Sequence, residues 1–184
     1  MTIEQTAFPG LLILQPKVFE DHRGYFFESY NKMTLQEAGI NFSFVQDNQA
    51  KSHFGTIRGL HFQAGAFAQT KLVRVLSGSI IDAVVDLRKG SPTFGLSFSI
   101  ELSDKNHTQV LIPKGFAHGY SVISESAEVF YKCDEFYNPS SEGGLFYNDP
   151  ALGIDWKVPG NRQLVSPKDL QYPLLKDLNI PFHY

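Results

Sequence analysis

The sequence predicts an all-β protein, a sandwich or barrel with only a few short helices. Short runs rich in β-branched and aromatic residues recur along the chain, and turn-forming Gly, Pro, Asn and Ser separate them. Aromatic residues make up 14% of the chain, with 16 Phe and 8 Tyr, and large rings suit the core of a β-protein. Regularly spaced short strands with few helical patterns are typical of sandwiches and barrels.

The length and composition fit one soluble globular domain. The chain has 184 residues, enough to bury a substantial core, and we expect a single domain spanning residues 1–184. A net charge of −3 gives no basic surface for nucleic acid. The single cysteine, Cys133, excludes an internal disulfide and a multi-cysteine metal site. Neither a signal peptide nor an apolar run of membrane-spanning length is evident, so we expect no membrane contact and a cytoplasmic location.

The first part of the chain contains strand candidates and one convincing helix. Residues 11–15 and 42–48 are predicted strands, and residues 20–24 are a predicted turn. Residues 31–39 are predicted to form a helix of one or two turns, because Gly39 suits the left-handed position that ends a helix.

Residues 71–88 carry the clearest strand signal. Residues 71–76 and 80–87 are two β-rich runs, and we expect Ser77-Gly78-Ser79 to join them as a tight hairpin. Further short strands are predicted at residues 95–102, 109–112, 119–123 and 127–133. After residue 137 the chain becomes irregular, and a short helix is expected to start at Ser166 with Pro167 at its first position.

The segment from Thr56 to Gln63 combines a guanidinium and an imidazole within an apolar run. Arg58 and His61 are three residues apart, so a regular strand would point them to opposite faces. Gly59 lies between them, and a glycine inside a strand often marks a bulge. We therefore expect a kink at Gly59 that lets both basic groups share one cavity.

Acid–base chemistry is the function that these residues favour. His61 is the best candidate for a general base, because an imidazole titrates near neutral pH. Such a base needs a carboxylate on its far nitrogen to orient it. Residue type and spacing leave four candidates for that carboxylate: Asp47, Asp82, Asp86 and Asp169.

Two further polar residues are expected on inward strand faces. Tyr131 alternates with Ala127, Val129 and Cys133, so its phenol points toward the core. A buried phenol requires a hydrogen-bond partner or has a functional role. Lys71 is likewise in register with apolar residues, and burying an ammonium without an anion is costly. An anionic ligand or intermediate would satisfy it. The cationic residues that could neutralise a diphosphate are Arg23, Arg58, Lys71 and Lys168.

A metal site is a weaker alternative. The chain has 6 His, and none of them forms a close His-x-His pair. A metal centre would require the fold to bring His61, His118 and a carboxylate together.

Sequence blocks throughout the chain carry a family resemblance. They run in order and are Asp21–Glu28, Val45–Asn48, Ile57–Gln63, Lys71–Val75, Val85–Arg88, Ile112–Gly119, Tyr131–Cys133, Asn148–Trp156 and Ser166–Asp169. This pattern resembles the dTDP-4-dehydrorhamnose 3,5-epimerase family of nucleotide-sugar biosynthesis. The resemblance implies a cupin-type jelly-roll sandwich or barrel. It also implies dTDP-4-keto-6-deoxy-D-glucose as substrate and dTDP-4-keto-L-rhamnose as product.

The resemblance also assigns chemical roles. It implies that His61 is the base, Asp169 its orienting carboxylate, Tyr131 the proton donor on the opposite face of the sugar, and Lys71 the support for the enolate oxygen. No cofactor or metal is expected, because the substrate ketone already acidifies the protons beside it.

Substrate binding and assembly are implied in the same way. The residues expected around the substrate are Arg23, Phe26, Glu28, Gln46, Asp47, Asn48, Arg58, Lys71, His118, Tyr137, Glu142 and Lys168. Among them, Arg23 and Arg58 would bind the diphosphate and Tyr137 would stack on thymine. Segment 21–28 would reach the site of the other subunit, which implies a homodimer.

The chain departs from the family pattern in three places, and alternatives stay open. Phe62 stands where Tyr is common, His53 where a small residue is common, and the loop 64–70 lacks the usual prolines. These departures leave open whether both carbons are epimerised. The alternatives are a mono-epimerase, a 3,4-ketoisomerase of a related deoxysugar pathway, a sugar-nucleotide-binding cupin without catalysis, and a metal-dependent cupin oxygenase.

Overall fold

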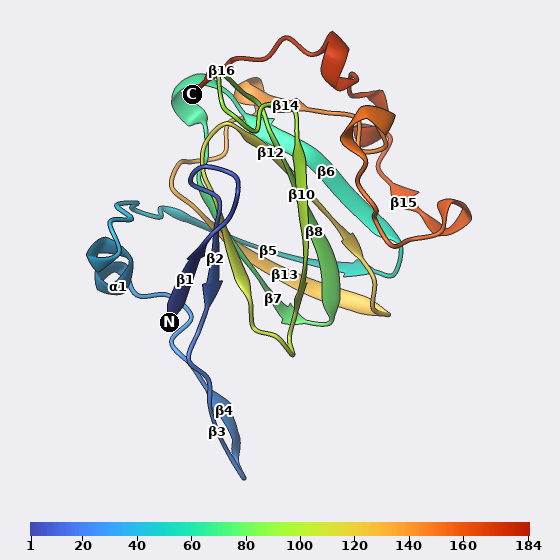
Figure 1. Ribbon diagram of the computed structural model, residues 1–184. Helices are drawn as coiled ribbons and strands as arrows, with labels where there is room; N and C mark the ends of the chain where they lie inside the picture. Colours follow the sequence, from blue (N-terminus) through green and yellow to red (C-terminus); the bar gives the residue numbers. More distant parts are fainter.

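The computed structural model describes residues 1–184 and contains two large sheets that face each other (Figure 1). In order across the first sheet, the strands are β1 (Thr2–Gln5), β2 (Leu12–Gln15), β11 (Gln109–Ile112), β7 (Lys71–Ser77), β13 (Ser126–Cys133) and β5 (Gln46–His53). The second sheet runs β10 (Ser97–Ser103), β8 (Ser79–Asp86), β12 (Phe116–Val122), β6 (Thr56–Gln63) and β14 (Glu142–Gly144). β15 (Leu164–Val165) adds to β6 in parallel, and the other pairs within these sheets are antiparallel. The predicted all-β sandwich is confirmed.

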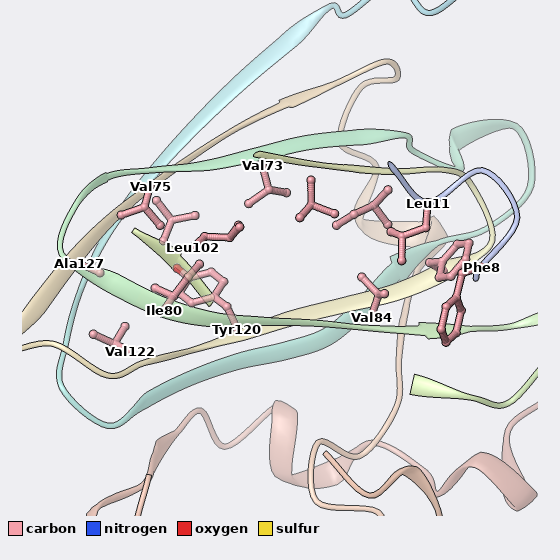
Figure 2. Packing of buried hydrophobic residues seen from close by; sticks show 14 residues of the cluster. Phe8, Leu11, Val73, Val75, Ile80, Val84, Leu102, Tyr120, Val122 and Ala127 are labelled. Carbon is pink, nitrogen blue, oxygen red and sulfur yellow. The ribbon is translucent and has the colours of Figure 1, made fainter. Parts of the chain in front are cut away.

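The main core fills the space between the two sheets. It contains 14 buried residues, and Figure 2 shows Val73 and Val75 of β7 facing Ile80 and Val84 of β8 across it. Strand alternation explains this arrangement, because every second side chain of each strand points into the same space. The cavity described below lies in this same interior, where polar residues replace the apolar ones.

Two further clusters, of 14 and 5 buried residues, cover the outer faces of the sheets. On the second sheet, residues of the C-terminal segment pack against Ala83 and Val85 of β8, and Trp156 and Phe182 are buried among them. On the first sheet, Leu35 of the helix α1 (Lys32–Glu37) packs against the strands.

The predicted helix is confirmed: the Asn31 side chain caps its start, and Gly39 has the expected left-handed conformation, with φ of +80°. The remaining helices are single 3-10 turns: η1 (Gly65–Phe67), η2 (Pro139–Ser141), η3 (Pro150–Leu152), η4 (Gly160–Arg162), η5 (Asp169–Gln171) and η6 (Leu175–Asp177). No helix is long and apolar enough to cross a membrane.

The tight connection at Ser77-Gly78-Ser79 differs from the predicted hairpin. β7 pairs with β11 and β13, whereas β8 pairs with β10 and β12, so the two strands belong to different sheets. Gly78 makes the turn possible, since its φ is +79° and a Cβ there would lie 2.1 Å from the carbonyl oxygen of Ser126. The prediction of two strands was right and the prediction of their pairing was wrong, because a local pattern does not specify a strand's neighbours.

The strand predicted at residues 42–48 is also displaced. β5 begins at Gln46 and continues to His53. Phe42 and Phe44 pack instead into the outer cluster around Leu35, where apolar surface is available. The polar run after Gln46 becomes the strand because it pairs along all of β13.

A hairpin projects away from the two sheets (Figure 1). It consists of β3 (Phe19–Asp21) and β4 (Gly24–Phe26), which pair only with each other. Its rings are exposed: Phe19 is 54%, Tyr25 57% and Phe26 70% accessible to solvent. At the other end of the molecule, β16 (Phe182–His183) pairs in parallel with β9 (Arg88–Lys89).

Candidate active site

A bulge in β6 brings Arg58 and His61 to the same side of the second sheet. In the register with β12, His61 lies opposite His118 and Arg58 lies opposite Tyr120. Three steps along β6 therefore match two steps along β12, so β6 carries one extra residue at Gly59. Gly59 has φ of +120°, and a Cβ there would lie 2.6 Å from the Cα of Gly119. The expected kink is confirmed, and it requires glycine for both reasons.

Both side chains line one cavity between the sheets. This cavity has a volume of about 430 Å³ and joins a second of about 270 Å³, with which it shares His61, Lys71, Tyr131 and Glu142. β6 and β12 form one wall, and β5, β7 and β13 form the other. The other residues lining the larger cavity are Ala50, Thr56, Ile57, Arg58, His118, Gly119, Tyr120, Leu164, Ser166, Lys168 and Asp169.

His61 is bound to one of the four candidate carboxylates. Its Nε2 lies 2.8 Å from Oδ1 of Asp169, whose Oδ2 accepts a hydrogen bond of 3.1 Å from the backbone N–H of Gly59. Ser166 caps the turn that carries this carboxylate, since its Oγ accepts a hydrogen bond from the backbone N–H of Asp169. Burial opposes the ionisation of Asp169, but the hydrogen bonds from His61 and Gly59 outweigh it and hold the pKa of the carboxyl below its usual value.

The other three candidate carboxylates have different partners. Asp82 is buried and its Oδ2 lies 2.7 Å from Nε2 of His118. Asp86 is buried against Arg88, and Asp47 accepts a hydrogen bond of 2.8 Å from Lys132. Two separate histidine–carboxylate pairs therefore present an imidazole to the cavity, since His61 and His118 both line it.

The wall opposite His61 carries Tyr131 and Lys71, as predicted from strand alternation. The Nζ of Lys71 lies 5.9 Å from the centre of the Tyr131 ring. Burial raises the pKa of Tyr131 to about 12, so its phenol stays protonated at neutral pH. Burial lowers the pKa of Lys71, whose amine has no carboxylate within 4.0 Å. This wall thus presents a protonated phenol and an amine that has no carboxylate partner.

Several of the predicted substrate-binding residues meet at the mouth of the cavities. The hydroxyl of Tyr137 donates to Oε2 of Glu142 over 2.7 Å, and Nζ of Lys168 donates to Oε1 over 2.6 Å. Burial opposes ionisation of Glu142, but these hydrogen bonds keep the pKa of its carboxyl below the usual value. Gln46 and Asn48 line the smaller cavity, and the Gln46 side chain accepts a hydrogen bond from the backbone N–H of Tyr137.

Four predicted residues do not reach the cavity of their own chain. Arg23, Phe26 and Glu28 belong to the projecting hairpin or follow it, and Arg23 forms an exposed ion pair of 2.7 Å with Asp21. Asp47 is adjacent in β5 to the inward Gln46 and Asn48, so alternation turns it to the outer face of the sheet, where Lys132 binds it.

The sequence-based prediction did not assign a role to two polar residues beside the cavity, Tyr120 in its wall and Asp82 behind His118. Asp82 alternates with the inward Ile80 and Val84 along β8, and this pattern signals a carboxylate aimed into the interior. Tyr120 lies two residues after His118, and its buried hydroxyl has no hydrogen-bond partner. Groups of three His, Cys, Asp or Glu side chains close enough to bind a metal ion do not occur in the chain.

Comparisons with known proteins give the same family as the sequence blocks. The family model described as dTDP-4-dehydrorhamnose 3,5-epimerase matches residues 5–177. An enzyme of that name from Salmonella typhimurium is 51% identical over 95% of this chain and 96% of its own. The crystal structure of an epimerase from Legionella pneumophila in complex with dTDP-4-keto-L-rhamnose has a TM-score of 0.94 at 43% identity, covering 100% of this chain and 98% of that one. A 3'-monoepimerase from Streptomyces bikiniensis in complex with dTDP-quinovose has a TM-score of 0.87 at 30% identity, over 93% of this chain and 86% of that one. The chain is therefore a cupin-type member of the dTDP-4-dehydrorhamnose 3,5-epimerase family.

Proposed function

We propose that this protein is a cofactor-free epimerase that inverts carbons 3 and 5 of dTDP-4-keto-6-deoxy-D-glucose to give dTDP-4-keto-L-rhamnose. The observation that carries the proposal is the pair of facing walls: His61 with its bound Asp169 on one, and Tyr131 with Lys71 on the other. Inversion beside a ketone requires a base on one face of the sugar and an acid on the other. A cavity with these groups on opposite walls meets that requirement.

The first half of each inversion is proton removal. Carbons 3 and 5 both flank the carbon 4 ketone, so loss of either proton gives an enolate. His61 takes the proton at Nδ1, because Nε2 is bound to Asp169, and the carboxylate stabilises the imidazolium that forms. Lys71 supports the enolate oxygen, since its amine has no carboxylate partner of its own.

The second half is proton return from the opposite face. Tyr131 donates its phenolic proton to the enolate carbon and recovers a proton from solvent. With a pKa of about 12, the phenol is fully protonated at neutral pH and is ready to act as an acid. The same base and acid serve both carbons in turn, provided that the sugar presents each carbon between the two walls.

Binding of the nucleotide uses the cationic and aromatic groups at the mouth. Arg58 and Lys168 neutralise the diphosphate and Tyr137 stacks on thymine, while Gln46, Asn48, His118 and Glu142 complete the site. We further propose a homodimer in which Arg23, Phe26 and Glu28 enter the partner's site. The exposed rings of the hairpin support this assembly, because Phe19, Tyr25 and Phe26 lie together on one projecting arm, and contiguous exposed apolar groups mark protein–protein contact sites. The interior shared by both sheets supports a single domain over residues 1–184.

A mono-epimerase is the second candidate, because the Streptomyces bikiniensis 3'-monoepimerase has the same fold. Proton NMR in D₂O with the dTDP-4-ketosugar separates the candidates. Deuterium at both carbons with formation of the L-rhamno product supports the 3,5-epimerase, and deuterium at one carbon supports the mono-epimerase. A 3-keto product would indicate a 3,4-ketoisomerase. Binding without any exchange would contradict the epimerase and ketoisomerase functions and favour a sugar-nucleotide-binding protein.

A further inference from the structure

We propose that Tyr172 is a positioning residue that fixes the plane of the His61 imidazole from outside the cavity. The inference deepens the proposed function and rests on it, because it assumes that His61 is the base. Tyr172 is not among the residues that line either cavity, so the proposal gives it no contact with substrate.

The two rings are in edge contact. The centres of the His61 and Tyr172 rings lie 5.7 Å apart, with an angle of 69° between their planes. Aromatic pairs prefer this edge-to-face arrangement, which restricts rotation of both rings. Tyr172 directly follows the turn η5, which begins with Asp169. One short turn therefore contacts the imidazole twice, through a carboxylate at its start and a ring just after its end.

The tyrosine ring occupies a space that Gly144 leaves open. Gly144 lies opposite His61 in the register of β14 and β6. A Cβ on Gly144 would lie 2.4–2.5 Å from three atoms of the Tyr172 ring, and these are its three nearest neighbours. The backbone of Gly144 does not have a positive φ, so the ring is the reason that a side chain is excluded at this position.

Two hydrogen bonds also hold Tyr172 in this position, one from its side chain and one at the next residue. Its hydroxyl donates to Oε1 of Glu142 over 3.4 Å. The next residue, Pro173, accepts a hydrogen bond of 2.8 Å from the backbone N–H of Phe146. The ring is thus attached to β14 and to the segment after it.

A second restraint on the imidazole has a chemical purpose. The bond to Asp169 fixes only Nε2, and the ring can still turn about that bond. Nδ1, on the other side of the ring, must abstract protons from two different carbons in turn. Small errors in the position of a reacting group are costly to rate. Contact with Tyr172 limits the turning and keeps Nδ1 aimed across the cavity.

Two substitutions at Tyr172 test the proposal by steady-state kinetics. Y172A removes the ring, and we expect kcat to fall by about 10- to 100-fold because the base is less well aligned. KM should change by no more than about twofold, since Tyr172 does not line the cavity. Y172F keeps the ring and loses only the long hydrogen bond to Glu142, so it should retain most of the wild-type kcat. A Y172A enzyme with wild-type kcat, or one altered only in KM, would overturn the inference.

Substitution of Gly144 provides an independent test. In G144A the new methyl group displaces the Tyr172 ring, so kcat should fall as it does in Y172A. In the double variant G144A/Y172A the clash is gone, and kcat should equal that of Y172A alone. A further loss in the double variant would show that Gly144 acts through something else and would overturn the proposal.

Controls separate folding and the proposed function from this inference. Calorimetric binding of dTDP shows that each variant is folded, and G144A carries the test if Y172A fails to fold. A wild-type protein without exchange activity would refute the proposed function itself. A wild-type protein with activity, together with unaffected Y172A and G144A variants, would refute the role of Tyr172 alone.

Discussion

His61 and His118 lie directly opposite each other on β6 and β12, and each imidazole is bound to its own carboxylate. The two pairs differ in exposure. The His118–Asp82 pair is buried, with side chains 8% and 1% exposed, whereas the His61 side chain is 31% exposed. The accessible imidazole of His61 suits proton transfer with a substrate. The buried imidazole of His118 suits a fixed hydrogen bond to the substrate.

This difference predicts different kinetic effects for the two carboxylates. D169N removes the charge that stabilises the His61 imidazolium, so kcat should fall by about a hundredfold or more. D82N weakens a charge-assisted bond that orients His118, a proposed substrate-binding residue, so KM should rise by about tenfold, or about 1.4 kcal/mol of binding. Kinetics of both variants with the dTDP-4-ketosugar test the distinction. Equal effects on kcat would contradict it.

Loss of the His61 imidazole should abolish exchange at both carbons. A well-placed base contributes about 10²- to 10⁴-fold to rate, and one imidazole serves both positions. Proton NMR of H61N in D₂O is the measurement. H53N is a matched control, because His53 is exposed at the end of β5 and lines neither cavity. Exchange that survives at one carbon in H61N would point to a second base.

The Y131F variant should separate proton removal from inversion. His61 can still form the enolate, so some exchange with solvent should remain on the His61 face. Delivery of a proton from the opposite face needs the phenol, so the inverted product should not accumulate. Time-resolved NMR distinguishes deuterium incorporation from product formation. Normal product formation by Y131F would remove the phenol from the mechanism.

Strand alternation explains which parts of the site were predictable. It pointed Tyr131 and Lys71 inward, and Gly59 marked the bulge that unites Arg58 with His61. These predictions depend on neighbours within one strand. The carboxylate that binds His61 belongs to Asp169, which lies 108 residues away along the chain. No local pattern distinguishes it from the carboxylates of Asp82, Asp86 or Asp47. Only the family resemblance selected Asp169.

The errors arose where long-range packing decides the outcome. β7 and β8 are adjacent in sequence, but each finds its partners in a different sheet. β5 is a polar run that became a strand because alternate residues, such as Gln46 and Asn48, face a polar cavity instead of an apolar core. The contact between Tyr172 and His61 depends on the empty space at Gly144, which the sequence shows only as one of its 15 glycines.

The proposed exchange of hairpins between subunits predicts complementation. R23A should weaken the partner's site, and H61N should inactivate its own. A mixed dimer of the two variants contains one site with both defects and one with neither. Random mixing should therefore restore about a quarter of the wild-type sites, since half of the dimers are mixed and each holds one intact site. The measurement is epimerase activity after the two variants are unfolded and refolded together, compared with that of each variant refolded alone. No gain over the separate variants would contradict the proposed exchange of hairpins.

Asp86 predicts how stability depends on pH. Burial opposes its ionisation, but hydrogen bonds from Arg88, Ser91 and Thr93 outweigh it and lower the pKa of the carboxyl below its ordinary value. Because the folded state lowers the pKa, the ionised carboxylate stabilises the fold above that value, and its contribution is lost as pH falls through the lower, folded-state pKa.

D86N should therefore be less stable at neutral pH and less sensitive to acid. The substitution leaves the Arg88 guanidinium buried without its partner, which costs about 3–5 kcal/mol. Urea unfolding at neutral and acidic pH, at one protein concentration, measures both effects. D155N is the control, because the ion pair of Asp155 with Lys157 is exposed and should contribute little. A D86N variant as stable as wild type at neutral pH, or with the same acid dependence, would show that this buried carboxylate does not stabilise the fold.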